Sequence, residues 1–297
     1  VAWIMNKYLI FRTDRIGDFL VTAILINCIK DNDVNAHITI VASSKNYDYI
    51  KSFKSVDEVI LLKTNLINKI LLIIKLFKER FKYIILHDDK KRSHLIAFFL
   101  KKELKISLNY EKTKTHLEIL EIISKLLNFK LEENHFNILQ DREINDLSFS
   151  NFVQLHFDEK WIHNNYIEKF VNIEPNPREL ASFINSIGIK TNKKVLLTTG
   201  KTPPSVLLEA LNMCKNKNIL FLKNLSFIEL ENIILKSDLL ISCHGSVSHV
   251  ASAKIIKQID IIDTSYPYNI WTHHFRNYNS VNRDKFAILA KKILEKI

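Results

Sequence analysis

The sequence predicts an α/β protein with two domains, each built on a mostly parallel, doubly wound sheet. Short apolar or β-branched runs alternate with stretches of helical spacing, and this alternation starts again after a proline-rich stretch in the middle of the chain. Several of the predicted strands also end in polar clusters. Such clusters are expected where the carboxyl ends of parallel strands face a ligand.

The stretch 9–26, LIFRTDRIGDFLVTAILI, predicts a strand, a tight loop and the start of a helix. Gly17 stands where the strand passes into the helix, and the chain holds only four glycines, so this position is one where a Cβ is costly. Asp18 follows at the helix start. It either faces a ligand beside the neighbouring arginines or simply caps the helix by accepting backbone N–H bonds.

The first domain continues this alternation up to a proline-rich linker. The predicted strands are 9–11, 36–42, 56–62, 83–86 and 104–108, and the later predicted helices are 66–81, 93–102, 115–127 and, within a polar segment, 166–171. Strand 83–86 ends in a second charged cluster, His87-Asp88-Asp89-Lys90-Lys91-Arg92. Two prolines in 174–177 oppose both helix and central strand, so we expect domains at 1–174 and 175–297.

The second domain predicts a further series of helices and strands. The helices are 178–187 (with Gly188 as its C-terminal cap), 205–214, 226–236, 250–253 and 285–297, and the strands are 194–197, 219–222, 238–242 and 259–262. Two loops follow strands here: Thr198-Thr199-Gly200-Lys201, and Cys243 to His249. Hydroxyls, backbone N–H groups and an ammonium in these loops favour phosphate binding. The alternative for each loop is a turn with a helix cap.

Two pairs of histidines invite comparison with metal sites. His244 and His249 lie five residues apart, and no acidic or histidine cluster accompanies them, so we predict no metal site. We expect at least one of the two to donate a hydrogen bond to a phosphate oxygen, and the alternative is a buried histidine satisfied by backbone. His273 and His274 stand without a motif, and we place them at the surface.

Composition and motifs exclude several classes of protein. Three cysteines without paired spacing indicate neither disulfides nor zinc, and no signal peptide or membrane-spanning run is visible, so we expect a cytoplasmic protein. The net charge of +11 predicts an anionic partner. The glycine spacing excludes a P-loop and a dinucleotide fingerprint, no GxSxG elbow is present, and no nucleic-acid-binding module is recognisable.

The chain resembles glycosyltransferase family 9, the heptosyltransferases of lipopolysaccharide assembly. The family's opening strand and polar-Ile-Gly-Asp loop correspond to Asp14-Arg15-Ile16-Gly17-Asp18-Phe19-Leu20, and its next strand, polar cluster and apolar helix correspond to 83–100. A threonine-rich strand end matches Thr198-Thr199. A D-[ST]-G-x-x-H-[LV]-A segment is similar to His244-Gly245-Ser246-Val247-Ser248-His249-Val250-Ala251.

The resemblance implies a GT-B fold, with two Rossmann-like domains facing a central cleft. It implies an inverting glycosyltransferase without metal or cofactor, which transfers a heptose from ADP-heptose to a lipopolysaccharide core or related cell-envelope glycan at the cytoplasmic face of the inner membrane. Asp18 falls on the family's general base. The implied donor site comprises Thr198, Thr199, Gly200, Lys201, His244, Gly245, Ser246, Val247, Ser248 and His249. Basic residues would hold an anionic glycolipid or oligosaccharide acceptor: Arg12, Arg15, Lys90, Lys91 and Arg92.

The sequence also departs from the family pattern. His244 stands where the family has an aspartate, and Ser246 stands where it has a glycine. These changes leave open a transferase for a CMP-linked acid sugar and a non-catalytic nucleotide- or glycan-binding protein. A separate alternative is a sugar-nucleotide epimerase or hydrolase on the GT-B scaffold.

Overall fold

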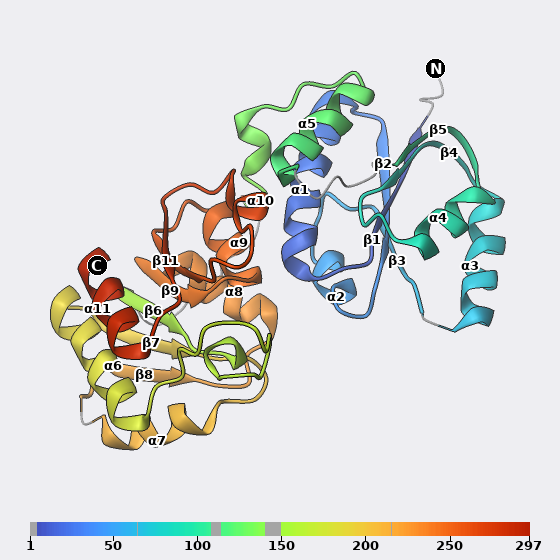
Figure 1. The fold of residues 1–297 in the computed structure, drawn as a ribbon. Helices are drawn as coiled ribbons and strands as arrows, with labels where there is room; N and C mark the ends of the chain where they lie inside the picture. The colour runs from blue at the N-terminus through green and yellow to red at the C-terminus, as the bar shows by residue number, and fades with distance from the viewer. Residues whose placement is uncertain (1–4, 64, 108–113, 140–149, 215) are drawn as a thin grey trace. The chain divides into compact units, whose positions relative to one another are not determined.

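The structure is a computed structural model that describes residues 5–63, 65–107, 114–139, 150–214 and 216–297. The chain divides into two compact units: unit 1 holds Val1–Arg142 and Asn269–His274, and unit 2 holds Glu143–Tyr268 and Phe275–Ile297. Each unit is an α/β fold around its own parallel sheet (Figure 1). The predicted fold class is confirmed for both units.

Unit 1 contains a five-stranded parallel sheet in the order β3-β2-β1-β4-β5. Its strands are β1 (Asn6–Arg12), β2 (Ala36–Ala42), β3 (Glu58–Leu61), β4 (Arg80–Leu86) and β5 (Lys101–Ser107). Its helices are α1 (Ile16–Asn32), α2 (Tyr47–Lys51), α3 (Leu66–Phe77), α4 (Lys91–Phe98), α5 (His116–Leu126), the 3₁₀ turn η1 (Glu133–Phe136) and α10 (Asn269–Thr272). β1 lies at the centre of this sheet, so the loop that follows it is held firmly.

Unit 2 contains a six-stranded parallel sheet in the order β11-β10-β9-β6-β7-β8. Its strands are β6 (Phe152–His156), β7 (Lys194–Thr198), β8 (Ile219–Leu222), β9 (Leu239–Cys243), β10 (Gln258–Ile262) and β11 (Tyr278–Asn282). Its helices are the 3₁₀ turn η2 (Glu159–Trp161), α6 (Pro177–Thr191), α7 (Ser205–Met213), α8 (Phe227–Lys236), α9 (Ser246–Ala253) and α11 (Phe286–Lys296).

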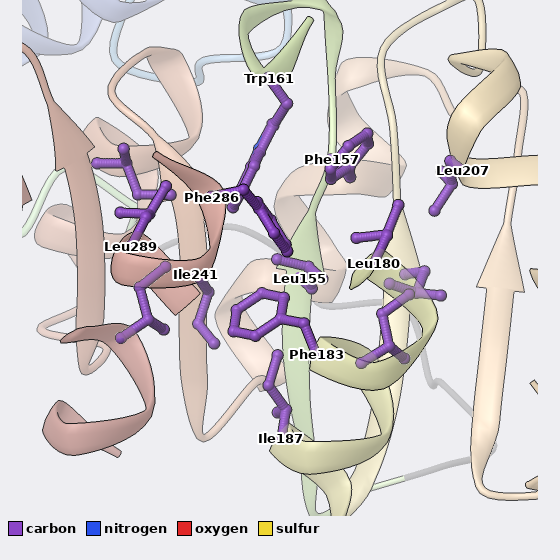
Figure 2. Close-up of a cluster of buried hydrophobic side chains, with 14 of the residues drawn as sticks. Leu155, Phe157, Trp161, Leu180, Phe183, Ile187, Leu207, Ile241, Phe286 and Leu289 are labelled. Carbon is purple, nitrogen blue, oxygen red and sulfur yellow. The ribbon is translucent and has the colours of Figure 1, made fainter. Parts of the chain in front are cut away.

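The core of unit 2 forms between one face of its sheet and the helices α6 and α11 (Figure 2). Phe183 of α6 and Phe286 of α11 meet edge to face at 5.7 Å between ring centroids. Phe157 and Trp161, just after β6, stack at 4.9 Å and are fully buried. The indole N–H of Trp161 donates to the carbonyl oxygen of His156 at 3.0 Å. These contacts fix the turn that leaves the central strand β6.

The boundary between the units differs from the predicted one at 174. β6 lies in the middle of the second sheet, paired with β7 on one side and β9 on the other, although the sequence predicted no strand there. The short helix α10 returns to unit 1, where the Trp271 ring lies 5.9 Å from the ring of His116. The proline pair at 175–177 therefore starts α6 inside unit 2, with Pro177 in the first turn, and does not separate domains.

Three predicted helices end or begin at other residues. The helix predicted over 66–81 ends at Phe77 because β4 begins at Arg80, and α4 ends at Phe98 because β5 begins at Lys101. α9 begins at Ser246, four residues earlier than predicted. Among the described residues, no helix has the length and apolar character required to cross a membrane.

Two further predictions in the second half are wrong. The helix predicted at 166–171 is a series of turns, because the Val171 N–H donates to Asp263 Oδ2 at 3.0 Å and the Phe170 ring lies under the Arg283 guanidinium. Gly188 does not cap α6, which continues to Thr191 and ends at Asn192 in the left-handed region with φ of 52°. Asparagine tolerates that conformation, so no glycine is needed there.

Candidate functional site

The candidate site of unit 1 lies where β1 and β4 end side by side. The chain passes from β1 outward to β3 and then returns to β4 on the other side of β1, so this pair is the switch point of the sheet. Ligands of open α/β sheets gather outside the strand ends at such a point. The two charged clusters after these strands, 12–15 and 87–92, are brought together as the sequence predicted.

Thr13 connects the two clusters through hydrogen bonds. Its hydroxyl donates to Asp88 Oδ2 at 2.5 Å and accepts from Arg92 Nη2 at 2.8 Å. The Lys90 ammonium donates to the carbonyl oxygen of Thr13 at 3.2 Å and forms an ion pair with Asp14. Two predicted acceptor-binding residues, Lys90 and Arg92, are therefore positioned half-buried beside the β1 loop.

The other predicted acceptor-binding residues differ in exposure. Arg15 and Lys91 are exposed, at the starts of α1 and α4. Arg12 is only 2% exposed, and its guanidinium donates to Thr22 Oγ1 at 2.6 Å and to Asp14 Oδ2 at 3.2 Å. Arg12 is thus the inward-facing last residue of a central strand and holds the β1 loop through these contacts.

Asp18 occupies the third position of α1 and is half-buried. Its Oδ2 accepts the backbone N–H of Arg15 at 3.1 Å, so it contributes to the helix start. Helix N-termini stabilise carboxylates because of the partial positive charge of the backbone N–H groups. Asp18 thus caps the helix at the very edge where the two charged clusters meet. The capping interpretation and the ligand-facing interpretation are compatible in this geometry.

Buried histidines lie beneath this edge. His87 is fully buried, with Nδ1 2.9 Å from Thr22 Oγ1, and burial together with the Arg12 charge holds the pKa of His87 well below its usual value. Burial, followed by the charge of Arg12, lowers the pKa of His116 to about 3. His274 is half-buried, and burial lowers its pKa to about 4, whereas the neighbouring His273 is exposed as the sequence predicted.

His116→Gln is expected to reduce the acid sensitivity of the fold. The folded-state pKa of His116 lies below the unfolded value of about 6.5, so the unfolded chain binds the proton first and stability falls as the pH drops below that value. Between pH 7 and pH 5 this one group removes about 2 kcal/mol from the free energy of unfolding. Urea unfolding at both pH values measures the difference. The exposed His163→Gln serves as the control, and equal pH dependence of the two variants contradicts the assignment.

The candidate site of unit 2 lies at the ends of β6 and β9. The chain runs from β6 through β7 to β8 on one side and then crosses to β9 on the other, so this pair is the switch point of the second sheet. The loop after β9 carries the predicted residues 244–249, and the loop after β7 carries 198–201. The turn after β6, residues 157–161, stands between these two loops because β6 lies between β9 and β7.

Asp158 and Lys160 form a buried ion pair in this turn. The Lys160 ammonium lies 2.6 Å from Asp158 Oδ2, and the side chains are 12% and 4% exposed, respectively. Burial works to raise the pKa of Asp158, yet Lys160 and His156 outweigh it and hold that pKa below its usual value. Burial works to lower the pKa of Lys160, and the Asp158 carboxylate reverses this. Both groups are therefore charged at neutral pH.

Glycines allow the turn to contact both neighbouring loops. A Cβ at Gly245 would lie 2.7 Å from the Lys160 ammonium, and a Cβ at Gly200 would lie 2.9 Å from Glu159 Oε2. A side chain at either position would therefore displace a charged group of the β6 turn. Gly245 is the residue before α9, so the Lys160 ammonium lies beside the N-terminus of that helix. The charge of the ammonium and the positive end of the helix dipole therefore both favour an anion at this point.

Asp260 of β10 organises the loop after β9. It is fully buried, and three groups share its carboxylate: His244 Nδ1 at 2.6 Å, Ser248 Oγ at 2.8 Å and Tyr278 OH at 3.1 Å. The carboxylate is an acceptor, so it places the His244 proton on Nδ1 and fixes the orientation of the ring. His249 is buried and meets the Phe275 ring edge to face at 4.9 Å. The two histidines therefore lie in different environments: the His244 ring is hydrogen-bonded to a carboxylate, and the His249 ring packs against an aromatic side chain.

The remaining predicted donor-site residues vary in accessibility. Thr198 is fully buried and bonded to Gln154 Nε2 and His156 Nδ1, and Val247 packs in the interior. The buried Thr199 hydroxyl has no hydrogen-bond partner among the described residues. A polar atom in this condition fits a site that a ligand completes. Lys201 is exposed and Ser246 is half-buried at the start of α9.

A pocket of about 770 Å³ adjoins Gly200 and Lys201 within unit 2. Its volume is in the range of small-molecule sites. Glu159 and Glu174 line it, together with Pro203. Carboxylates accept hydrogen bonds from hydroxyl groups and repel phosphate. Two carboxylates against the single ammonium of Lys201 give the lining a net negative charge, so the pocket fits a neutral, hydroxyl-bearing part of a ligand better than an anionic one.

Sequence reasoning missed Asp158, Lys160 and Asp260. The first two follow a strand that the sequence did not reveal, since Gln154 and His156 interrupt the apolar residues of β6 and leave no continuous apolar run. A strand signal at 152–156 is nevertheless present in its apolar residues. Asp260 stands inside an apolar strand, where an isolated acidic residue signals a buried carboxylate with a partner.

No family model and no curated protein matches the sequence. Solved structures do match. The heptosyltransferase WaaC of E. coli with ADP aligns over 98% of this chain and 100% of that chain, with a TM-score of 0.72 at 12% identity. A family 9 glycosyl transferase from Veillonella parvula aligns over 98% of this chain and 90% of its own, with a TM-score of 0.70 at 13% identity. The chain has a GT-B fold.

The GT-B scaffold also serves other enzymes. The UDP-GlcNAc 2-epimerase of Methanocaldococcus jannaschii aligns over 99% of this chain and 92% of that chain, with a TM-score of 0.58 at 12% identity. The heptosyltransferases thus score higher than this epimerase over the same span. The resemblance to family 9 predicted from the sequence is confirmed at the level of the fold.

Proposed function

We propose that this protein is a glycosyltransferase that moves a sugar from a nucleotide donor to an anionic cell-envelope glycan. The observation that carries the proposal is the position of Asp18 among cationic residues at the switch point of unit 1, in a chain whose fold matches heptosyltransferases along 98% of its length. We propose further that unit 1 binds the acceptor and unit 2 binds the donor.

In the proposed reaction the acceptor hydroxyl attacks the anomeric carbon of the donor. The new C–O bond forms as the bond from that carbon to the nucleotide phosphate breaks, and the electron pair leaves with the phosphate. Asp18 accepts the acceptor proton as general base. A single displacement of this kind inverts the anomeric centre. Lys90 and Arg92, which already border the β1 loop, bind phosphate or carboxylate groups of the acceptor.

Unit 2 offers a cationic setting for the departing phosphate. The proposed contacts are the Lys160 ammonium, the N-terminal backbone of α9 at Ser246 and the free hydroxyl of Thr199. Such groups stabilise charge that develops on a leaving group without needing a metal or a proton donor. The acidic pocket beside Gly200 would take a hydroxyl-bearing part of the same donor.

The donor we propose first is ADP-heptose, and the acceptor is a lipopolysaccharide core or related glycan in the cytoplasm. Two of the matched heptosyltransferase structures hold ADP or ADP-2-deoxy-2-fluoro heptose, which supports this choice. His244 supports an alternative. Its ring is oriented by Asp260 with Nε2 directed away from that carboxylate, and an imidazole there suits an anionic sugar such as that of a CMP-linked acid-sugar donor.

A nucleotide that binds unit 2 is expected to raise the melting temperature of the protein. A ligand at 100 times its dissociation constant adds about 2.7 kcal/mol to the free energy of unfolding. The measurement is a thermal-shift panel of ADP, UDP, GDP, CMP and their sugar adducts. A rise in melting temperature with ADP or its sugar adducts supports the heptosyltransferase proposal. A rise with CMP or its sugar adducts supports the acid-sugar alternative. The absence of any shift contradicts a donor site in unit 2.

A second candidate function is that of a sugar-nucleotide epimerase. The alignment with UDP-GlcNAc 2-epimerase favours it, and so does the His244–Asp260 pair, because a carboxylate-oriented imidazole is a competent proton-transfer group. An epimerase converts its nucleotide sugar without an acceptor. Chromatography of nucleotide sugars incubated with the protein alone therefore separates the two functions.

A further inference from the structure

Helix α3 of unit 1 exposes an apolar face. Six large apolar side chains of this helix are between 48% and 71% exposed: Leu66, Ile67, Ile70, Leu71, Ile74 and Phe77. Its opposite face is buried, because Leu72 and Leu76 pack in the core against the sheet. Soluble proteins rarely leave so many large apolar side chains together in water. The fold therefore does not need this face for its own core.

The end of helix α4 extends the apolar face. Ile96 and Ala97 of α4 belong to the same core cluster as Leu72 and Leu76 of α3, so the two helices cover the same face of the sheet (Figure 1). On the outer side of α4, Leu95, Phe98 and Phe99 are between 47% and 72% exposed. We refer to these nine exposed side chains, eight from α3 and α4 and one from Phe99 just after α4, as the α3–α4 surface.

The segment that carries the α3–α4 surface is strongly basic. Residues 66–105 contain eleven lysines and arginines but only four aspartates and glutamates, so this segment carries a net +7 of the chain's +11. One cation lies against an exposed ring of this surface: the Lys101 ammonium stands 5.1 Å over the Phe77 ring. Apolar side chains within a strongly basic segment are the combination that binds anionic lipid surfaces.

We propose that the α3–α4 surface docks on an anionic lipid bilayer, with α3 lying in the plane of the interface. Twelve residues of helix extend about 18 Å, well short of the roughly 30 Å of a bilayer core, so α3 lies along the surface and does not cross it. The charge argues against a second copy of the chain as the occupant, because two identical segments of net +7 repel each other. This inference does not depend on the proposed transferase activity.

The double variant Ile67→Asp/Ile74→Asp is expected to bind anionic vesicles at least about tenfold more weakly than the wild-type chain. The variant places two carboxylates at side chains that are 70% and 53% exposed and that would contact the lipid acyl chains in the docked state. The matched control is Val34→Asp/Ile189→Asp, which adds the same charge at apolar positions that are 85% and 79% exposed and are not part of this surface, and it is expected to bind like wild type. Phe98→Asp on α4 tests the same surface from a second helix.

The measurement is co-sedimentation of the full chain with vesicles of phosphatidylcholine alone or with about 30% phosphatidylglycerol, at low and high salt. Wild type is expected to prefer the anionic vesicles and to lose affinity in high salt. Equal binding to both vesicle types, or equal losses in the α3 variant and its control, overturns the proposal. The proposal is also overturned if light scattering shows that the wild-type chain is a dimer and that the Ile67→Asp/Ile74→Asp variant is a monomer. Nucleotide thermal shifts of the α3 variant, expected to equal those of wild type, separate this result from failure of the proposed function.

Discussion

Asp18→Asn is expected to lower kcat for glycosyl transfer by about 10²–10⁴-fold while nucleotide binding remains unchanged. An amide cannot take the proton of the acceptor hydroxyl. Its oxygen can still accept the backbone N–H of Arg15, which is the only hydrogen bond described for the Asp18 carboxylate, so the start of α1 is retained. The variant therefore separates the chemical role of this carboxylate from its role in the fold.

The assay follows transfer from the nucleotide sugar that gives the largest thermal shift to purified lipopolysaccharide core. Asp48→Asn is the control, because Asp48 is also an acidic residue in the first turn of a helix of unit 1 and is exposed. It should leave kcat within about twofold of wild type, since surface substitutions away from the site have small effects. Activity of Asp18→Asn close to that of the control would reduce Asp18 to a helix cap. A nucleotide thermal shift without turnover in wild type would favour the non-catalytic binding protein.

The sequence predicts unit 1 better than unit 2, and the strands explain the difference. β1, β2 and β4 have strong apolar or β-branched runs, and each is followed by a turn or charge signal that marks its end. β6 has three apolar residues among five and β11 only two, so neither presents the continuous apolar or β-branched run that marks β1, β2 and β4. Their place in the sheet is fixed by pairing with strands distant in the chain, which local sequence does not record.

The same difference explains which site residues the sequence predicts. The sequence locates the loops that follow strands with clear apolar runs. Asp18, Thr199 and His244 lie in or next to such loops, at the ends of the strands, as expected. The sequence does not indicate which cations are buried. Arg12 and Arg15 look equivalent in sequence, yet one is enclosed by the core and the other is exposed. Lys160 was indistinguishable from many surface lysines, because its ion pair depends on the turn that Trp161 anchors.

Lys160→Met is expected to lower the free energy of unfolding of unit 2 by about 3–5 kcal/mol. Removing the ammonium leaves Asp158, whose side chain is only 4% exposed, charged and without its cation. The variant should also weaken nucleotide binding, since the same ammonium lies beside Gly245 at the N-terminus of α9. Urea unfolding with and without nucleotide measures both effects on one sample.

The pair Lys193–Asp238 provides the matched control in the same unit. Its atoms are 2.8 Å apart, but its side chains are 37% and 38% exposed. Lys193→Met should therefore cost less than about 1 kcal/mol, because water screens and solvates exposed ion pairs. The double variant Asp158→Asn/Lys160→Met should recover part of the loss, since no buried charge is then left alone. Equal losses for Lys160→Met and Lys193→Met would contradict the buried pair.

The pH dependence of the Lys160→Met effect identifies its electrostatic origin. The folded-state pKa of Asp158 lies below the unfolded value of about 3.9, so the contribution of the pair is fully present above about pH 4 and is lost as the pH falls toward the folded value. The difference between wild type and Lys160→Met should therefore be constant near neutral pH and shrink in acid. A cavity left by a shortened side chain would instead cost the same at every pH. A pH-independent loss would therefore assign Lys160 a packing role and remove the electrostatic support for its contact with a donor phosphate.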